Sequence, residues 1–259
     1  FLAKFLINKG YFVIGLKRSI KNNFIGLNYL NIIKNIKIIE KKSNDNKFWT
    51  KLLNTYSVSE VYNLSSLSSV GQSFTNSSET LYSNFYYYKE IVDCIFKINP
   101  NTKFFQASSS DMFGDTGNLV INENTLMNPI SPYGLSKSLA HNHAKFLRTY
   151  ENKFISSGVL FNHESCLRSE KFVFKKIINH LVLNKLGLVN SKLRLGDISV
   201  IRDWGYAPKY VEAMWMMLQH SCGDDYVVAT GETHTVQEWL DETFKLAGLD
   251  ASKHVSQDP

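Results

Sequence analysis

Two short segments of this chain hold residue types that can move protons. Residues 106–114 read Gln-Ala-Ser-Ser-Ser-Asp-Met-Phe-Gly, and residues 131–137 read Ser-Pro-Tyr-Gly-Leu-Ser-Lys. Tyr133 and Lys137 are four positions apart, so on a helix they share one face, where the ammonium lets the tyrosine act as a base below its ordinary pKa of about 10. The three serines before Asp111 add hydrogen-bond donors, and Asp111 is a second possible base. A Tyr-x-x-x-Lys spacing alone is weak evidence for a catalytic site. Together with the preceding Ser-Pro and the upstream Ser-Ser-Ser-Asp, it favours such a site.

Hydrophobic spacing predicts the elements that hold these segments in place. Short apolar runs predict strands, and apolar residues at helical spacing predict helices between them. The expected strands are residues 11–16, 60–64, 102–107 and 156–161, and the expected helices are residues 48–56, 83–98 and 133–150. This alternation is typical of a doubly wound parallel sheet, in which ligands gather at the carboxyl ends of the strands. Later helices at 168–186, 203–220 and 236–246 and a strand at 226–230 predict an interleaved second lobe.

The opening of the chain resembles the second half of a βαβ unit. Residues 1–7 have helical spacing, Gly10 ends that helix, and the strand 11–16 follows. We therefore expect the first strand, with the glycine-rich turn that holds a dinucleotide pyrophosphate, to precede residue 1. The sheet should then have a gap where that strand belongs, and residues 1–259 alone should bind a dinucleotide poorly or not at all.

Three further segments identify a family resemblance. They read Gly-Val-Leu-Phe-Asn-His-Glu-Ser at 158–165, Leu-Gly-Asp and Arg-Asp-Trp-Gly within 195–205, and Trp-Met-Met-Leu-Gln leading to Tyr-Val-Val-Ala-Thr-Gly within 215–231. With these segments the sequence resembles the extended short-chain dehydrogenase/reductase superfamily and, within it, the GDP-mannose 4,6-dehydratase family. The resemblance implies a Rossmann-like α/β fold, with a dinucleotide-binding part at 1–165 and a mainly substrate-binding lobe at 166–259. It covers nearly every residue but not the whole family domain, so we expect a fragment lacking both ends.

The resemblance also implies a reaction and a set of roles. GDP-mannose would be oxidised at C4 with NADP as cofactor, would lose water across C5 and C6, and would regain the hydride at C6. Tyr133 would be the redox base, Lys137 would lower its pKa and hold the nicotinamide ribose, Ser109 would bond the sugar 4-hydroxyl, and Asp111 would take the C5 proton. The implied further cofactor contacts are Arg18, Leu64, Ser65 and His163, and the implied substrate contacts are Asn162, Arg168 and Arg202.

The chain departs from the family pattern at several of these places. Asp111 replaces a glutamate, which withdraws the carboxylate by about 1.5 Å, the length of one carbon–carbon bond, and puts the dehydration step in doubt. Ser109 replaces a threonine but keeps the hydroxyl. The other replacements are Lys42 for Asp, Leu67 for Gln, Leu167 for Arg and Tyr206 for His.

Three alternatives remain open at this point. Asp111 could instead cap the turn that leads to Gly114. The protein could be a nucleotide-sugar epimerase or reductase of the same superfamily, which needs no C5 base of the dehydratase kind. It could also be a non-catalytic remnant that binds a nucleotide or a partner without turnover.

Composition limits the remaining classes. A chain of 259 residues with 44% hydrophobic residues can bury a full core, and a net charge of +6 suits an anionic nucleotide. Lysines concentrated in the early stretch favour a solvated face over a nucleic-acid or membrane patch. Three widely spaced cysteines, without a Cys-x-x-Cys, indicate neither a disulfide framework nor a zinc site and fit a reducing cytosol. His141 and His143 should face different sides of one helix. The family resemblance implies a dimer or tetramer.

Overall fold

Parallel strands form the centre of the larger of two units, in a computed structural model that describes residues 1–20, 24–41, 46–117 and 119–257. This unit, unit 1, comprises Phe1–Phe161 and Pro208–Val228. Unit 2 comprises Asn162–Ala207 and Ala229–Pro259. The chain therefore leaves the first unit, returns to it once, and leaves it again.

The strands of unit 1 fall into two groups. β1 (Val13–Lys17) pairs in parallel with β2 (Ile36–Glu40). The second group has the order β10-β5-β4-β3 and is also parallel, with bounds Asp225–Val228, Ile155–Leu160, Lys103–Ser109 and Glu60–Asn63. Within the described residues no strand joins β1 to β3. The predicted gap in the sheet is therefore present.

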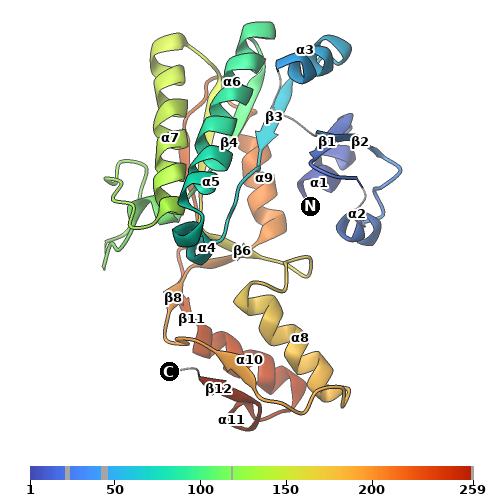
Figure 1. Cartoon of the computed structure of the whole chain (residues 1–259), viewed down its shortest axis with the longest axis vertical. Coiled ribbons are helices and arrows are strands. Elements are labelled where there is room, and N and C mark those ends of the chain that lie inside the picture. Colours follow the sequence, from blue (N-terminus) through green and yellow to red (C-terminus); the bar gives the residue numbers. More distant parts are fainter. Residues whose placement is uncertain (21–23, 42–45, 118, 258–259) are drawn as a thin grey trace. The chain divides into compact units, whose positions relative to one another are not determined.

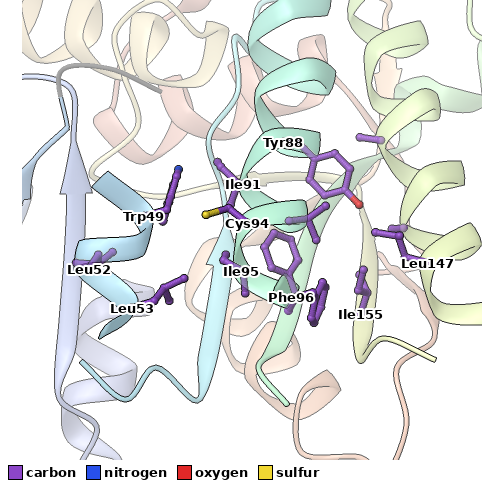
Figure 2. Close-up of a cluster of buried hydrophobic side chains, with 14 residues drawn as sticks. Trp49, Leu52, Leu53, Tyr88, Ile91, Cys94, Ile95, Phe96, Leu147 and Ile155 are labelled. Atoms are coloured by element: carbon purple, nitrogen blue, oxygen red, sulfur yellow. The ribbon is translucent and has the colours of Figure 1, made fainter. Parts of the chain in front are cut away.

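Helices cover both faces of the larger sheet, as a doubly wound fold requires. Successive side chains of β4 point to opposite faces, so Phe104 and Phe105 enter different cores. Phe104 packs with α3 (Asn46–Thr55), α6 (Tyr87–Ile98) and α7 (Pro132–Glu151), in the cluster that Figure 2 shows. Phe105 packs with α9 (Ala207–Met217), and α1 (Leu2–Asn8) contributes to that cluster (Figure 1). The sheet's alternation thus fixes α7 on the face to which Ser108 also points.

Shorter helices connect these elements. The chain forms α2 (Ile25–Tyr29), α4 (Val70–Thr75), α5 (Ser77–Leu81), a π-helical segment at Tyr82–Tyr86 and a 3₁₀ turn at Ser110–Phe113. The π-helical segment and α6 together occupy the predicted helix 83–98. The 3₁₀ turn directly follows β4, so it begins at the carboxyl end of the sheet.

Among its described residues, unit 2 has small paired strands and three helices. β6 (Asn162–Glu164) pairs with β9 (Trp204–Tyr206), β7 (Leu193–Leu195) with β12 (Val255–Gln257), and β8 (Ile201–Arg202) with β11 (His234–Thr235). The helices are α8 (Val173–Lys185), α10 (Val236–Ala247) and α11 (Ala251–His254). Apolar side chains from α8, β7 and α10 form one core. A capping box between Thr235 and Glu238 starts α10.

Some predicted bounds were wrong. β2 was not predicted, because Lys37 interrupts its isoleucines and the residues just before it are rich in lysine and asparagine. The helices predicted at 168–186 and 203–220 begin later, at Val173 and Ala207, because β9 and the turns after β6 take the first residues. In the part of the chain that the structure describes, no helix is both long enough and apolar enough to cross a bilayer.

Candidate active site

Ser109 and Asp111 meet where β4 ends. Ser109 is the last residue of the strand and caps the 3₁₀ turn by accepting the Asp111 N–H at 3.3 Å. Its hydroxyl donates to Asp111 Oδ2 at 2.9 Å. The alternative in which Asp111 caps this turn is therefore wrong, because Ser109 is the cap and Asp111 lies inside the turn. A hydroxyl and a carboxylate are brought together at the carboxyl edge of the sheet.

Gly114 fixes the end of this turn. Its φ is +66°, and a Cβ there would lie 2.2 Å from the Asn128 carbonyl oxygen. Both the backbone conformation and the close approach require glycine. The turn that carries Asp111 is thus held against the backbone at Asn128.

Gly114→Ala is expected to lower the free energy of unfolding by about 1–3 kcal/mol, because a residue with a side chain is strained at this φ and its Cβ would strike the Asn128 carbonyl. Urea denaturation measures this change. Gly117→Ala is the matched control, since Gly117 also has a positive φ of +55° but has nothing within 4 Å of its Cβ position. Equal losses from both variants would mean that the contact with Asn128 contributes nothing.

Tyr133 lies in the first turn of α7, as the sequence predicted. Ser131 caps the helix by accepting the Gly134 N–H at 3.0 Å, and Pro132 occupies the first position, where a missing N–H costs nothing. Tyr133 is buried, and its N–H donates to Ser73 Oγ at 3.2 Å. A Cβ on Gly134 would lie 2.4 Å from the Asp111 carbonyl oxygen. The first turn of α7 therefore contacts the turn that carries Asp111.

Lys137 joins α7 to the end of β4. Its ammonium donates to the Ala107 carbonyl oxygen at 2.9 Å and lies 5.8 Å from the centre of the Tyr133 ring. Burial lowers the pKa of Lys137 to about 8, and the Asp111 carboxylate opposes that shift. Ser109, Asp111, Tyr133 and Lys137 are thus grouped around one junction of strand and helix. Their catalytic roles stay predictions.

The lowered pKa of Lys137 predicts an early alkaline limit. The ammonium is present below about pH 8 and is lost as the pH rises through that value, instead of near the ordinary 10.5. We expect kcat to fall above about pH 8 for that reason. In Asp111→Asn the opposing carboxylate is gone, so the fall should begin at a lower pH. The pH profile of cofactor reduction in a single turnover, a step that both proteins should retain, measures the shift, and a kcat that stays level to pH 10 in the unaltered protein would contradict the expected alkaline limit.

The carboxyl ends of β1 and β3 carry residues that fit a nucleotide. Arg18 follows β1 and is exposed, and its charge opposes the raised pKa that burial gives the Tyr87 phenol. Leu64 and Ser65 follow β3, and Leu64 is 47% exposed although it is apolar. Ser66 Oγ is buried without a hydrogen-bond partner in the described part of the chain. An unpartnered hydroxyl two residues after an exposed apolar side chain suits a dinucleotide at the carboxyl end of β3, and an exposed guanidinium suits one at the carboxyl end of β1.

Asn162 and His163 belong to unit 2. Both lie on β6, where Asn162 is opposite Trp204 of β9 and His163 is opposite Gly205. The predicted contact of His163 with the cofactor stays a prediction, because His163 and the residues around the end of β4 lie in different units.

The two arginines predicted to contact substrate have different surroundings. Arg168 is engaged within unit 2, because its Nε lies 3.3 Å from Glu164 Oε2 and its guanidinium lies 3.4 Å from the centre of the Phe172 ring. Burial raises the pKa of Glu164, and Arg168 opposes that shift. Arg202 is exposed and donates to the Ile201 carbonyl oxygen at 2.7 Å. Arg202 is therefore the more accessible cation.

A cavity of about 1050 Å³ lies within unit 2. Its wall includes Phe174, whose ring centre is 4.2 Å from that of Trp239 and 4.8 Å from that of Trp204. Tyr206, which replaces the family's histidine, also lines it. That replacement therefore alters the wall of an aromatic cavity.

Two other residues that depart from the family pattern lie elsewhere. Leu167 lies in the turn after β6, where its N–H donates to Ser165 Oγ, and Lys42 is outside the described residues.

The sequence did not reveal several residues that hold the site together. Ser73 fixes the Tyr133 backbone, as described above. Asn84, in the π-helical segment, donates to Ser136 Oγ at 3.0 Å and bonds both the N–H and the carbonyl oxygen of Leu67. π-helical turns commonly mark such sites. The available signal was one asparagine inside an aromatic run.

Asp203 is a further residue of this kind. It is buried and accepts backbone N–H groups from Thr230 at 2.9 Å and Gly231 at 2.8 Å. The Arg-Asp-Trp-Gly segment thus includes a structural anchor between Arg202 and Trp204.

Among the described residues no cluster of three or more histidine, cysteine, aspartate or glutamate side chains could hold a metal ion, and Cys94, Cys166 and Cys222 are free thiols.

Comparisons with known proteins cover nearly the whole chain. A family model described as GDP-mannose 4,6 dehydratase matches residues 1–258. GDP-mannose 4,6 dehydratase 1 of Arabidopsis thaliana is 39% identical over 269 residues, which cover all of this chain and 74% of that protein. The Homo sapiens protein of the same description is 35% identical, over 94% of this chain and 68% of that one.

Solved structures show the same fold at low sequence identity. A dTDP-glucose 4,6-dehydratase from Streptomyces venezuelae, with NAD and TYD bound, has a TM-score of 0.87 at 16% identity. The match covers 99% of this chain and 80% of that one. The predicted Rossmann-like fold is confirmed.

Proposed function

The chain belongs to the GDP-mannose 4,6-dehydratase family, and from that premise we propose that it is a lyase converting GDP-mannose to GDP-4-keto-6-deoxymannose. The observation that carries the proposal is the grouping of Ser109, Asp111, Tyr133 and Lys137 around the junction of β4 and α7. A hydroxyl, a carboxylate and a Tyr–Lys pair are the groups that this conversion needs on one hexose ring.

Each of the four side chains has a distinct task in the proposed reaction. The Tyr133 phenolate takes the proton of the sugar 4-hydroxyl, while Ser109 holds that hydroxyl by a hydrogen bond. The buried Lys137 ammonium favours the phenolate. Oxidation at C4 makes the C5 hydrogen acidic, so the Asp111 carboxylate can take that proton while the hydroxyl leaves C6, and the proton and the hydroxyl together make up the water that is lost. NADP, when bound, supplies the reversible hydride acceptor for the first and last steps.

The cofactor and substrate contacts extend the proposal. Arg18, Leu64 and Ser65 would hold the dinucleotide at the edge of the sheet, where the orphan hydroxyl of Ser66 supports a bound polar group. Arg18 favours NADP over NAD, because a guanidinium pairs with a 2′-phosphate. His163 would add a cofactor contact.

In unit 2, Asn162, Arg168 and Arg202 would contact the nucleotide sugar. A guanidinium pairs with diphosphate oxygens through two parallel hydrogen bonds. The exposure of Arg202 supports this role, whereas Arg168 would have to exchange its ion pair with Glu164. The net charge of +6 is in keeping with an anionic substrate. We place the protein in the reducing cytosol, in line with its free thiols. We also propose that it forms a dimer or tetramer, as its family resemblance implies.

Product analysis tests the proposed function. The full-length gene product is incubated with GDP-mannose and NADP, and the sugar products are identified by mass spectrometry and NMR. A 4-keto-6-deoxy sugar supports the proposal. A C4 epimer, or a reduced sugar without loss of water, would support the second candidate, an epimerase or reductase, which the shorter Asp111 side chain favours. No turnover with intact nucleotide binding would indicate a non-catalytic protein.

A further inference from the structure

A buried polar chain links α7 to two strands of the sheet. Ser108 Oγ lies 2.8 Å from His141 Nδ1, and His141 Nε2 lies 3.6 Å from Asp225 Oδ2. Arg148 holds the same carboxylate with two hydrogen bonds, at 3.1 and 2.7 Å. Ser108 and His141 are each only 3% exposed. From this geometry we infer that His141 is a positioning residue that sets the place of Tyr133 and Lys137 on α7, an inference that rests on the proposed function.

The contact between His141 and Ser108 joins α7 to β4 at a second point, in addition to the contact of Lys137 with Ala107. Ala107 and Ser108 are adjacent on β4, and the Ala107 carbonyl accepts from Lys137 while the Ser108 hydroxyl meets His141. Lys137 and His141 are four residues apart, about 6 Å along a helix. One tie would let the helix slide or rotate about it, whereas two ties fix both position and rotation. Tyr133 is one further turn along the same stripe of α7.

The ring has a defined orientation in this arrangement. A carboxylate only accepts hydrogen bonds, so the proton belongs on Nε2, facing Asp225. Nδ1 then accepts from the Ser108 hydroxyl. Arg148 keeps Asp225 in place from the other side, and Asp225 lies on β10. His141 therefore fixes the position of α7 relative to both β4 and β10.

The consequence for catalysis is geometric. Ser109 follows Ser108 directly, so the tie to His141 sets the distance between the strand end that carries Ser109 and the helix start that carries Tyr133. A displacement of about 1 Å in such a site can lower a rate by about a hundredfold. His141 touches neither substrate nor cofactor in this scheme and acts through Ser108 and α7.

The test compares His141→Leu, Ser108→Ala and His141→Asn in the full-length gene product, with kcat and KM for GDP-mannose and the melting temperature measured for each. We expect the first two variants to lower kcat about 10- to 100-fold while KM changes by less than about threefold. His141→Asn should recover most of kcat, because its Oδ1 can accept from Ser108 as Nδ1 does. Ser108→Ala keeps the test decisive if the leucine variant does not fold.

His143→Leu is the matched control on the same helix. His143 faces Phe85 and Tyr88, with ring centres 6.2 and 5.7 Å away, and so lies on another side of α7. It should leave kcat unchanged even if it lowers the melting temperature. A His141→Leu or Ser108→Ala enzyme with kcat within twofold of the unaltered protein at 25 °C would overturn the inference, as would an asparagine variant no better than leucine.

Amide hydrogen exchange separates this inference from the proposed function. Residues 132–137 should exchange faster in His141→Leu and Ser108→Ala than in the unaltered protein or His143→Leu. That measurement needs no turnover. Unchanged exchange in this turn would reject the positioning role even in an active enzyme, and faster exchange in a protein that turns over no GDP-mannose would leave the positioning role supported and the proposed function rejected.

Discussion

Tyr133→Phe is expected to lower turnover of GDP-mannose by about 100- to 10,000-fold, the range that a positioned general base contributes. The variant removes only the hydroxyl, and the buried ring keeps its place in the first turn of α7. Because oxidation at C4 precedes every later step, both hydride transfer and loss of water should stop together. The measurement is the rate of 4-keto-6-deoxy product by the full-length gene product, with cofactor reduction followed by absorbance in a single turnover.

Tyr150→Phe serves as the control for this prediction. Tyr150 lies on the same helix, is 75% exposed, and contacts Phe146 with ring centres 5.2 Å apart. The same loss of a hydroxyl at this place should leave turnover unchanged. A Tyr133→Phe enzyme that retained a tenth or more of its turnover would show that another group takes the proton.

Asp111→Asn is expected to lower elimination of water by a similar factor of about 100 to 10,000, while Asp111→Glu should raise it. The asparagine keeps an oxygen that can accept from Ser109, so the turn after β4 should hold its shape. The glutamate restores the methylene that the family has and moves the carboxylate about 1.5 Å toward C5. The product rate of the three proteins measures the effect.

The single-turnover signal distinguishes the two steps. In Asp111→Asn, oxidation at C4 should continue, so reduced cofactor should accumulate instead of returning to its oxidised form. Asp115→Asn, an exposed aspartate in the same loop, is the control and should change neither step. Undiminished dehydration by Asp111→Asn would remove Asp111 as the base and favour an epimerase or reductase.

The sequence predicted the parts of the site that depend on local spacing. Tyr133 and Lys137 lie on one helical face because four residues make about one turn, and the Ser-Pro before them starts the helix. Ser109 was predicted to follow a strand and proved to be its last residue. These relations involve neighbours in the chain, so composition and spacing suffice to predict them.

The rest of the site depends on contacts between distant segments. His141 was predicted only to face a different side from His143, and nothing in its spacing named Ser108 or Asp225 as neighbours. Those partners are set by the order of β4, β5 and β10 in the sheet, which sequence spacing does not reveal. The lowered pKa of Lys137 has the same origin, since it depends on the burial of that side chain between distant segments.

The break between β1 and β3 has a consequence for the colloidal behaviour of residues 1–259. Each of these strands pairs on one side only within the described residues, so each presents a row of backbone groups to any strand that reaches it. Phe12, the residue before β1, is 70% exposed and adds an apolar surface. Self-association through these edges should therefore limit the concentration at which the chain stays monodisperse. This limit does not depend on the side chains of the candidate active site.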